Sequence, residues 1–298
     1  MMSDHDDEDF ESLYQRGLRF RQFGETAAAI DAFRSALQIN PDHVESLVAL
    51  GNLLEEDWKL DEARSQYSRA VEVDPEALLP RQYLGRLESS TGHFEEAVKA
   101  LKTYQELGGE DVETLLTLAE AASKVNDCKT VLKATKAVLD LDDSAYKAWE
   151  LRGICYAHTE KYNEACICLN MAIDLHPSSI EALNAVGDVC YQNENYHCSS
   201  EFFESSLKVR SEQPDIMFKY ATSLWFLDRW SEAVPLFEKY TSLRPEDARG
   251  WNNLGVVLRE KGDVKRSVEC YRKALELNPN MEVVKSNMET AMNMQVLT

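Results

Sequence analysis

The sequence predicts an all-α protein, and three observations along the chain lead to this prediction. First, a pattern recurs every 34 residues through most of the 298-residue chain, without an insertion or a deletion. Second, a small residue and a larger one recur four residues apart in each copy, which places both on one face of a helix. Third, glycine and proline are scarce, at 12 and 8 residues, which leaves room for long helices.

The first half of each repeat is marked by a small residue at its eighth position. Glycine inside a helix is intrinsically unfavourable, so its recurrence needs a packing reason, and we expect a close approach of a neighbouring helix. The repeats start at Phe10, Val44, Leu78, Val112, Tyr146, Ile180, Pro214 and Ala248. Their eighth residues are Gly17, Gly51, Gly85, Ala119, Gly153, Gly187, Ala221 and Gly255.

The second half of each repeat predicts a partner helix. Position 20 is small in most copies, and position 24 carries a larger group such as Phe33, Tyr67 or Phe203. A turn between the two helices is predicted at position 15, and five repeats end at a proline, which cannot continue a helix. The four turn residues that indicate it are Gly24, Gly92, Asn126 and Gly262. Each repeat is therefore predicted to be a helix, a tight turn and a second helix.

Residues 251–255 (WNNLG) and 271–279 (YRKALELNP) resemble the tetratricopeptide repeat family, and the resemblance covers residues 10–281. It implies a right-handed α-solenoid of antiparallel helix pairs, the superhelix of this family. Residues 282–298 place Val283, Val284, Met288 and Met292 at helical spacings and are expected to form a C-terminal capping helix. The acidic residues 1–9 are expected to form a disordered, solvated tail.

The charge of the chain disfavours polyanionic partners. Its 52 acidic and 32 basic residues give a formal net charge of −20. Nucleic-acid binding depends on Lys and Arg that neutralise phosphates, and anionic membrane surfaces attract the same residues. We therefore expect no nucleic acid among the partners.

The chain carries no sign of secretion or membrane insertion. It begins with acidic residues, unlike a signal peptide, and has no apolar stretch long enough to span a bilayer. Seven cysteines, an odd number, fit free thiols better than a disulfide framework. A cytoplasmic location is expected, with the nucleus left open.

No motif of an enzyme or a cofactor site is present, so no catalysis, no cofactor and no metal are expected. Five cysteines gather in repeats 5 and 6, but they lack the paired spacing of a zinc site. We interpret these residues as buried thiols that pack as small hydrophobic groups: Cys155, Cys166, Cys168, Cys190 and Cys198. Pro235 falls inside the second helix of repeat 7, where it should kink the helix or leave a carbonyl unpaired.

The family resemblance also implies where a ligand binds, because positions 2, 5, 9, 12 and 13 of the first helix tend to face the concave side. In repeats 1–5 these positions are mild or acidic: Glu45, Glu55, Glu56, Glu113, Glu120 and Glu150. In repeats 6–8 they combine amides, aromatic rings and arginine, which suit a short peptide segment. These predicted peptide-binding residues are Asn184, Tyr191, Phe218, Trp225, Phe226, Arg249, Asn252 and Arg259. Alternatively, Trp225 and Phe226 pack on the adjoining repeat.

Two functions follow from this reading. The first is a non-catalytic adaptor or scaffold that binds a peptide segment of partner proteins in its groove, most strongly at repeats 6–8. The acidic N-terminal half would favour a basic partner by electrostatic steering. The second is a structural subunit that uses its ends or convex faces in a multiprotein or homo-oligomeric assembly, with the groove empty or filled by residues 282–298.

Overall fold

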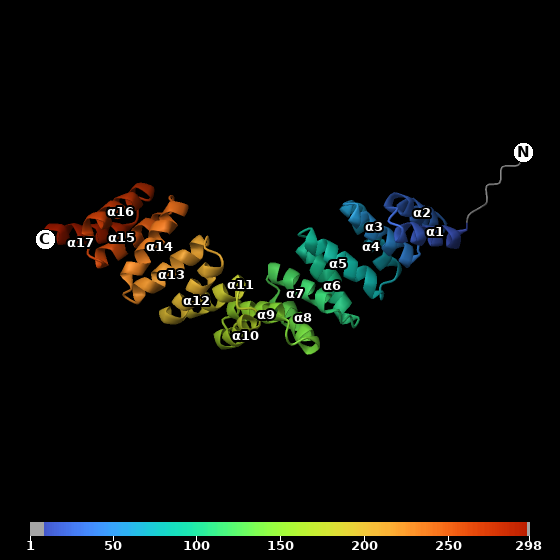
Figure 1. Cartoon of the computed structure of the whole chain (residues 1–298), viewed down its shortest axis with the longest axis horizontal. Coiled ribbons are helices and arrows are strands. Elements are labelled where there is room, and N and C mark those ends of the chain that lie inside the picture. Colours follow the sequence, from blue (N-terminus) through green and yellow to red (C-terminus); the bar gives the residue numbers. More distant parts are fainter. Residues whose placement is uncertain (1–8, 297–298) are drawn as a thin grey trace, which may run out of the picture. The chain divides into compact units, whose positions relative to one another are not determined.

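The computed structural model describes residues 9–296, and all regular structure in this range is α-helical (Figure 1). This confirms the predicted all-α class: across the described residues there are 17 helices, which form eight consecutive pairs followed by one last helix. The chain divides into two compact units, residues 1–151 and 152–298, and the division falls within α9 (Tyr146–His158). Most of the predicted acidic tail, residues 1–8, lies outside the described residues, as do residues 297 and 298.

The N-terminal unit contains four complete helix pairs. The two helices of each pair pack against one another, and the second helix of a pair packs on the first helix of the next. The eight helices are α1 (Phe10–Gln22), α2 (Thr26–Ile39), α3 (Val44–Glu56), α4 (Leu60–Val73), α5 (Leu78–Ser90), α6 (Phe94–Glu106), α7 (Val112–Lys124) and α8 (Cys128–Leu141).

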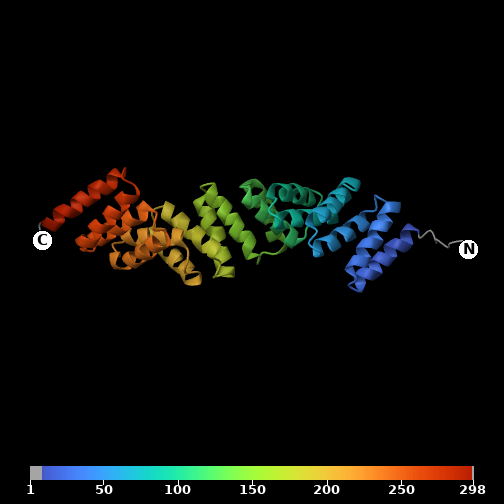
Figure 2. The same cartoon turned by 90° about the horizontal axis from the view of Figure 1, so that it is seen from above.

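The C-terminal unit follows the same plan, in which each helix from α10 onward packs on the next one along the chain. Figure 2 shows the last two helices of this unit side by side. The helices are α10 (Tyr162–Leu175), α11 (Ile180–Gln192), α12 (Tyr196–Val209), α13 (Pro214–Phe226), α14 (Trp230–Leu243), α15 (Ala248–Glu260), α16 (Val264–Leu277) and α17 (Glu282–Val296).

The small residue at position 8 makes room for the large residue at position 24 of the same pair. The odd-numbered helices α1 to α15 begin at the eight repeat starts given above. A methyl group added at Gly17 would lie 2.8 Å from the Phe33 ring, and one at Gly255 would lie 2.6 Å from the Tyr271 ring. Both rings are completely buried. The close approach is thus a ring on a bare backbone, which a larger side chain at position 8 would block.

Every turn between the helices of a pair has a residue in the left-handed region at position 15. The predicted turn residues adopt it, from Asn126 at a φ of 57° to Gly262 at 93°. The same backbone geometry occurs at four positions that the sequence did not single out, namely Trp58, Glu160, Glu194 and Asp228. Side chains with a Cβ are disfavoured there, and a bulky one most of all.

Helix α17 packs on α16 through a narrow apolar face. Val284 and Ala291 are fully buried, and Met288 is half-buried beside them. Their cluster includes Val268 and Tyr271 of α16. Val283 and Met292, which the sequence grouped with this face, are instead exposed.

Two local expectations can be compared with the structure. Cys190 of α11 and Cys198 of α12 form a disulfide, with a Cα–Cα separation of 5.8 Å, so the prediction of free thiols is wrong for this pair. Cys166, Cys168 and Cys270 are free thiols. Pro235 lies within α14, and the helix continues beyond it to Leu243.

Candidate functional site

Three of the predicted peptide-binding residues line one cavity of about 290 Å³ in the C-terminal unit. They are Trp225 on the last turn of α13, and Asn252 and Arg259 on α15. The other residues that line it are Thr222, Phe237, Asn253, Val256, Val257, Val283 and Asn287. The cavity therefore lies among α13, α14, α15 and α17.

Helical spacing explains why these side chains meet. Asn252, Val256 and Arg259 are four and three residues apart, so they form one stripe along α15. Val283 and Asn287 are four residues apart on the first turns of α17 and face the same space. The last helix thus contributes one wall of the cavity.

The polar groups of the cavity are amides and one guanidinium. The Asn287 amide donates a hydrogen bond of 3.1 Å to Oδ1 of Asn252, whose own amide donates to Oδ1 of Asn253 at 3.0 Å. The Arg259 side chain is 17% exposed, and its guanidinium lies 2.7 Å from the carboxylate of Glu260. No carboxylate is among the side chains that line this cavity, so its one formal charge is positive.

On α16, the buried Tyr271 hydroxyl makes no hydrogen bond within the described part of the chain. Burial raises the pKa of Tyr271, an effect that the nearby Ser267 hydroxyl and Arg259 oppose. The Ser267 hydroxyl is near enough to the Tyr271 hydroxyl to affect its pKa, but the two hydroxyl groups do not reach hydrogen-bonding geometry. Tyr271 packs on Gly255 of α15 and is not among the residues that line the cavity.

Two further predicted residues, Tyr191 and Phe226, belong to an aromatic row beside the cavity. Phe226 is 48% exposed and stacks on Tyr196 at 4.1 Å between ring centroids. Tyr191 meets the edge of Tyr196 at 5.9 Å, and Trp225 lies 4.6 Å from Phe226. The row connects α11 and α12 to the tryptophan of the cavity, so Phe226 does pack on the adjoining pair.

The remaining three predicted residues make contacts elsewhere. Phe218 packs at 5.7 Å against Phe237 and at 5.1 Å against Tyr240, within the core between α13 and α14. The Asn184 amide donates to Oε1 of Gln213 at 2.9 Å. Neither residue is among those that line the cavity.

Arg249 binds the N-cap of its own helix. Its guanidinium donates to both carboxylate oxygens of Asp247, at 3.1 and 2.9 Å, and its side chain is otherwise 74% exposed. The hydrogen bonds from Arg249 lower the pKa of Asp247 to about 2. The Tyr240 hydroxyl donates to the same carboxylate at 2.7 Å. Arg249 does not line the cavity, and its part in peptide binding stays a prediction.

Comparison with known proteins identifies the repeats. Models of the tetratricopeptide repeat match residues 20–79 and residues 248–281. The chain is a tetratricopeptide repeat protein. One similar solved structure is that of the tetratricopeptide repeat protein YrrB, which is described as having an unusual peptide-binding site. The alignment covers 64% of this chain and 98% of YrrB, with a TM-score of 0.57 and 19% sequence identity. The Naa15/Naa10 complex bound to HypK-THB aligns with 93% of this chain, at a TM-score of 0.54 and 18% identity.

Curated relatives of this tetratricopeptide repeat protein are longer than the chain. The human protein O-mannosyl-transferase TMTC1 is 24% identical over 83% of this chain and 24% of its own length. The bovine BBSome complex member BBS4 is 22% identical over 94% of this chain and 54% of its own. The peroxisomal targeting signal receptor of Candida albicans is 24% identical over 58% of this chain and 36% of its own. The chain thus spans about half of these relatives' length or less.

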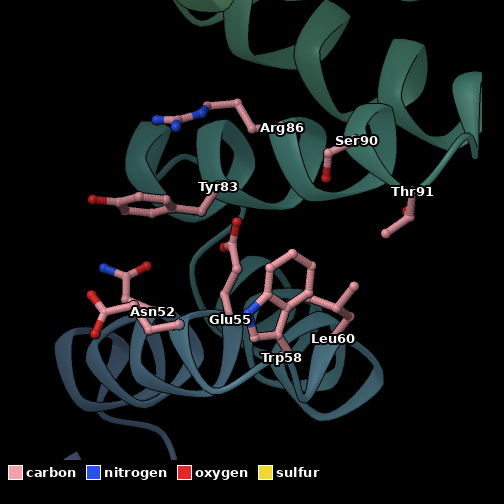
Figure 3. A pocket seen from close by; sticks show the side chains of 9 residues that line it. Asn52, Glu55, Trp58, Leu60, Tyr83, Arg86, Ser90 and Thr91 are labelled. Atoms are coloured by element: carbon pink, nitrogen blue, oxygen red, sulfur yellow. The ribbon is translucent and has the colours of Figure 1, made fainter.

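A second cavity, in the N-terminal unit, was not foreseen as a site. It measures about 760 Å³ and lies beside α3, α4 and α5 (Figure 3). The side chains that line it are Asn52, Glu55, Glu56, Trp58, Leu60, Tyr83, Arg86, Ser90 and Thr91. The tetratricopeptide positions indicated Glu55 and Glu56 but not Trp58, which stands in the turn. Glu150, another acidic residue that the tetratricopeptide positions indicated, is buried, and its carboxylate lies 2.5 Å from the Lys147 ammonium.

No helix within residues 9–296 is both long and apolar enough to cross a bilayer. In the same range, no three His, Cys, Asp or Glu side chains gather as the ligands of a metal ion would.

Proposed function

We propose that this tetratricopeptide repeat chain is a non-catalytic interaction protein that holds a short segment of a partner protein in the cavity of its C-terminal unit. The observation that carries the proposal is the composition of that cavity. It combines one half-buried tryptophan, three asparagine side chains and one arginine, with no acidic side chain among the lining residues.

Each part of the cavity suits a part of a peptide. Trp225, Val256 and Phe237 offer an apolar wall to one bulky side chain. The amides of Asn253 and Asn287 can donate to and accept from a peptide backbone. A guanidinium binds a carboxylate through two parallel hydrogen bonds, so Arg259 favours an acidic residue or a chain end beside the apolar anchor.

The size of the cavity favours a segment over a folded domain or a cofactor. At about 290 Å³ it lies at the lower limit of the range of ligand pockets, roughly 300–1,000 Å³. The similar proteins support an interaction role, because they include a peptide-binding repeat protein, a receptor for a targeting signal and a member of a multiprotein complex.

A selection experiment tests the proposal. A random peptide library is selected on the intact chain, and the recovered peptides are measured against Trp225→Ala and Arg259→Gln. We expect peptides with an apolar residue next to a carboxylate, bound at least about tenfold more weakly by each variant, since loss of a buried anchor or a charged pair costs over about 1.4 kcal/mol. Arg272→Gln, an exposed change on α16, is the matched control. Equal binding by all three variants would place the peptide site elsewhere.

A structural role in an assembly is the second candidate, and exposed apolar side chains near the end of α17 favour it. Met292 and Met294 are exposed by 44% and 41%. Exposed apolar groups on one helix can mark a protein contact. Light scattering across a dilution series separates the candidates: a mass that rises with concentration supports assembly, and a constant monomer mass counts against self-assembly.

A further inference from the structure

We propose that the N-terminal unit contains a second binding site, centred on Trp58, that takes an arginine side chain from a basic segment of a partner protein. The arginine would lie against the Trp58 indole and pair with the carboxylates of Glu55 and Glu56. This site is separate from the cavity of the C-terminal unit and does not depend on it.

Trp58 has an unusual combination of exposure and backbone geometry. Its side chain is 83% exposed, and its φ of 59° lies in the left-handed region. Other repeats have Gly24, Gly92 or Asn126 at the same turn position, residues that adopt this geometry readily. An exposed indole at a left-handed backbone position contributes little to the stability of the fold. Contact with a partner protein would explain why a tryptophan stands there.

The cavity next to Trp58 is open between two successive helix pairs. Figure 3 shows Glu55 extending from α3 toward α5, with the Trp58 indole and Leu60 beside it. Tyr83 lies across from them on α5. An indole face, a phenol ring and a carboxylate thus border one space of about 760 Å³.

The Glu55 carboxylate is held in place by the core. The buried Tyr67 hydroxyl lies 2.9 Å from Oε2 of Glu55 and 2.6 Å from Oδ1 of Asn52. Burial, followed by the charge of Glu55, raises the pKa of Tyr67, so the phenol remains a donor. The Tyr67 ring stacks on Tyr83 at 5.6 Å. The Glu55 carboxylate, which we propose as the hydrogen-bond acceptor for the arginine side chain, is therefore already oriented.

The charges around the cavity favour a cation. The cations at this cavity have acidic neighbours: Arg86, which lines it, lies 3.9 Å from Glu113, and Lys59 lies 2.7 Å from Asp57. Arg64, which donates to the lining residue Thr91, lies 2.8 Å from Glu88. Within the described chain, neither Glu55 nor Glu56 has a basic side chain within ion-pair distance. Residues 9–151 contain 27 acidic and 16 basic residues, a formal charge of −11. A basic segment would be attracted to this unit, and a polyanion repelled.

The chemistry favours arginine over lysine. A guanidinium is planar, so it can stack on an indole face and still direct two N–H groups at a carboxylate. A lysine ammonium is a compact and strongly hydrated charge that cannot do both in the same way. The pairing of Trp58 with Glu55 therefore predicts a preference between two peptides of equal charge.

The test uses a dye-labelled peptide of alternating serine and arginine, compared with a lysine peptide of the same length, by fluorescence polarisation on the whole chain. We expect the arginine peptide to bind more tightly. We expect Trp58→Gly, and separately Glu55→Gln with Glu56→Gln, to weaken its binding by about five- to tenfold, the effect of one cation–π contact or charged pair. The glycine fits the left-handed turn, so this variant should remain folded, which circular dichroism checks.

Two matched controls make the result specific. Phe23→Gly removes another exposed aromatic side chain at the end of a first helix, and Glu95→Gln with Glu96→Gln removes the same charge from the exposed first turn of α6. Both should change binding by less than about twofold, or well under 1 kcal/mol. Equal effects of cavity and control variants would overturn the proposal, as would no binding by the unaltered chain or a preference for lysine.

Discussion

Replacing one tyrosine by phenylalanine should have opposite effects in two repeats. Tyr67 and Tyr271 occupy the same repeat position, are both fully buried, and each packs its ring on a glycine. The Tyr67 hydroxyl has Asn52 and Glu55 as acceptors at 2.6 and 2.9 Å. In the last repeat the two equivalent residues are Val256 and Arg259, and the Tyr271 hydroxyl makes no hydrogen bond in the described structure.

The magnitudes follow from these partners. A hydrogen bond to a charged group contributes about 1.5–3 kcal/mol, so Tyr67→Phe should lower the free energy of unfolding by about 2 kcal/mol. A buried hydroxyl without a partner carries a desolvation cost of about 1–3 kcal/mol. Tyr271→Phe removes that cost together with a few van der Waals contacts, so it should raise the free energy of unfolding by about 1 kcal/mol.

Urea denaturation followed by far-UV circular dichroism measures both changes, and an unchanged dependence on urea shows that the variants unfold in the same way. The two curves should move in opposite directions from that of the unaltered chain. Equal destabilisation by Tyr67→Phe and Tyr271→Phe would refute the reasoning, because it would mean that the Tyr271 hydroxyl has a hydrogen-bond partner.

Three further outcomes are expected from the same geometry. Trp58→Gly should leave the free energy of unfolding unchanged or raise it by up to ~1 kcal/mol, since relief of the left-handed strain offsets the greater freedom of glycine in the unfolded chain. Thermal unfolding measures this change. A clear loss of stability would mean that Trp58 contributes to the fold. Gly255→Ala should destabilise by about 1–3 kcal/mol, because its methyl group would meet the Tyr271 ring at 2.6 Å; wild-type stability in urea would contradict the packing described. Asp247, whose pKa is lowered from 3.8 to about 2, should contribute stability that is present above pH 3.8 and lost as the pH falls toward 2; Asp247→Asn should remove this part of the pH dependence, and an unchanged acid profile would exclude the ion pair with Arg249.

The fold was predictable because its rules are local and repeated. A glycine or alanine at position 8 and a ring at position 24 indicate one contact, and the structure shows it between Gly17 and Phe33 and again between Gly255 and Tyr271. Eight copies in one register also fix where each helix pair begins. The disulfide between Cys190 and Cys198 was missed, although both residues flank the turn between α11 and α12 and an antiparallel pair brings such positions together.

The candidate site was only partly predictable, because a position on a helix indicates a direction but not a neighbour. Trp225 and Arg259 do line one cavity. Phe218 packs on the rings of α14, and Arg249 binds a carboxylate two residues away. The wall formed by Asn287 depends on how α17 packs, which no repeat pattern specifies. Trp58 was missed because the family positions cover the helix and leave out the turn.

The central claim, that a partner segment lies in the cavity of the C-terminal unit, is tested most directly by site-specific photo-crosslinking. A photoreactive amino acid is placed at Val256 within the cavity, or at Arg272 on the exposed side of α16, and the chain is irradiated with a peptide selected on the unaltered protein. Our account predicts crosslinking from position 256 and none from position 272, with the label mapped to the peptide's apolar residue. Equal crosslinking at both positions, or crosslinking at position 272 alone, would contradict it.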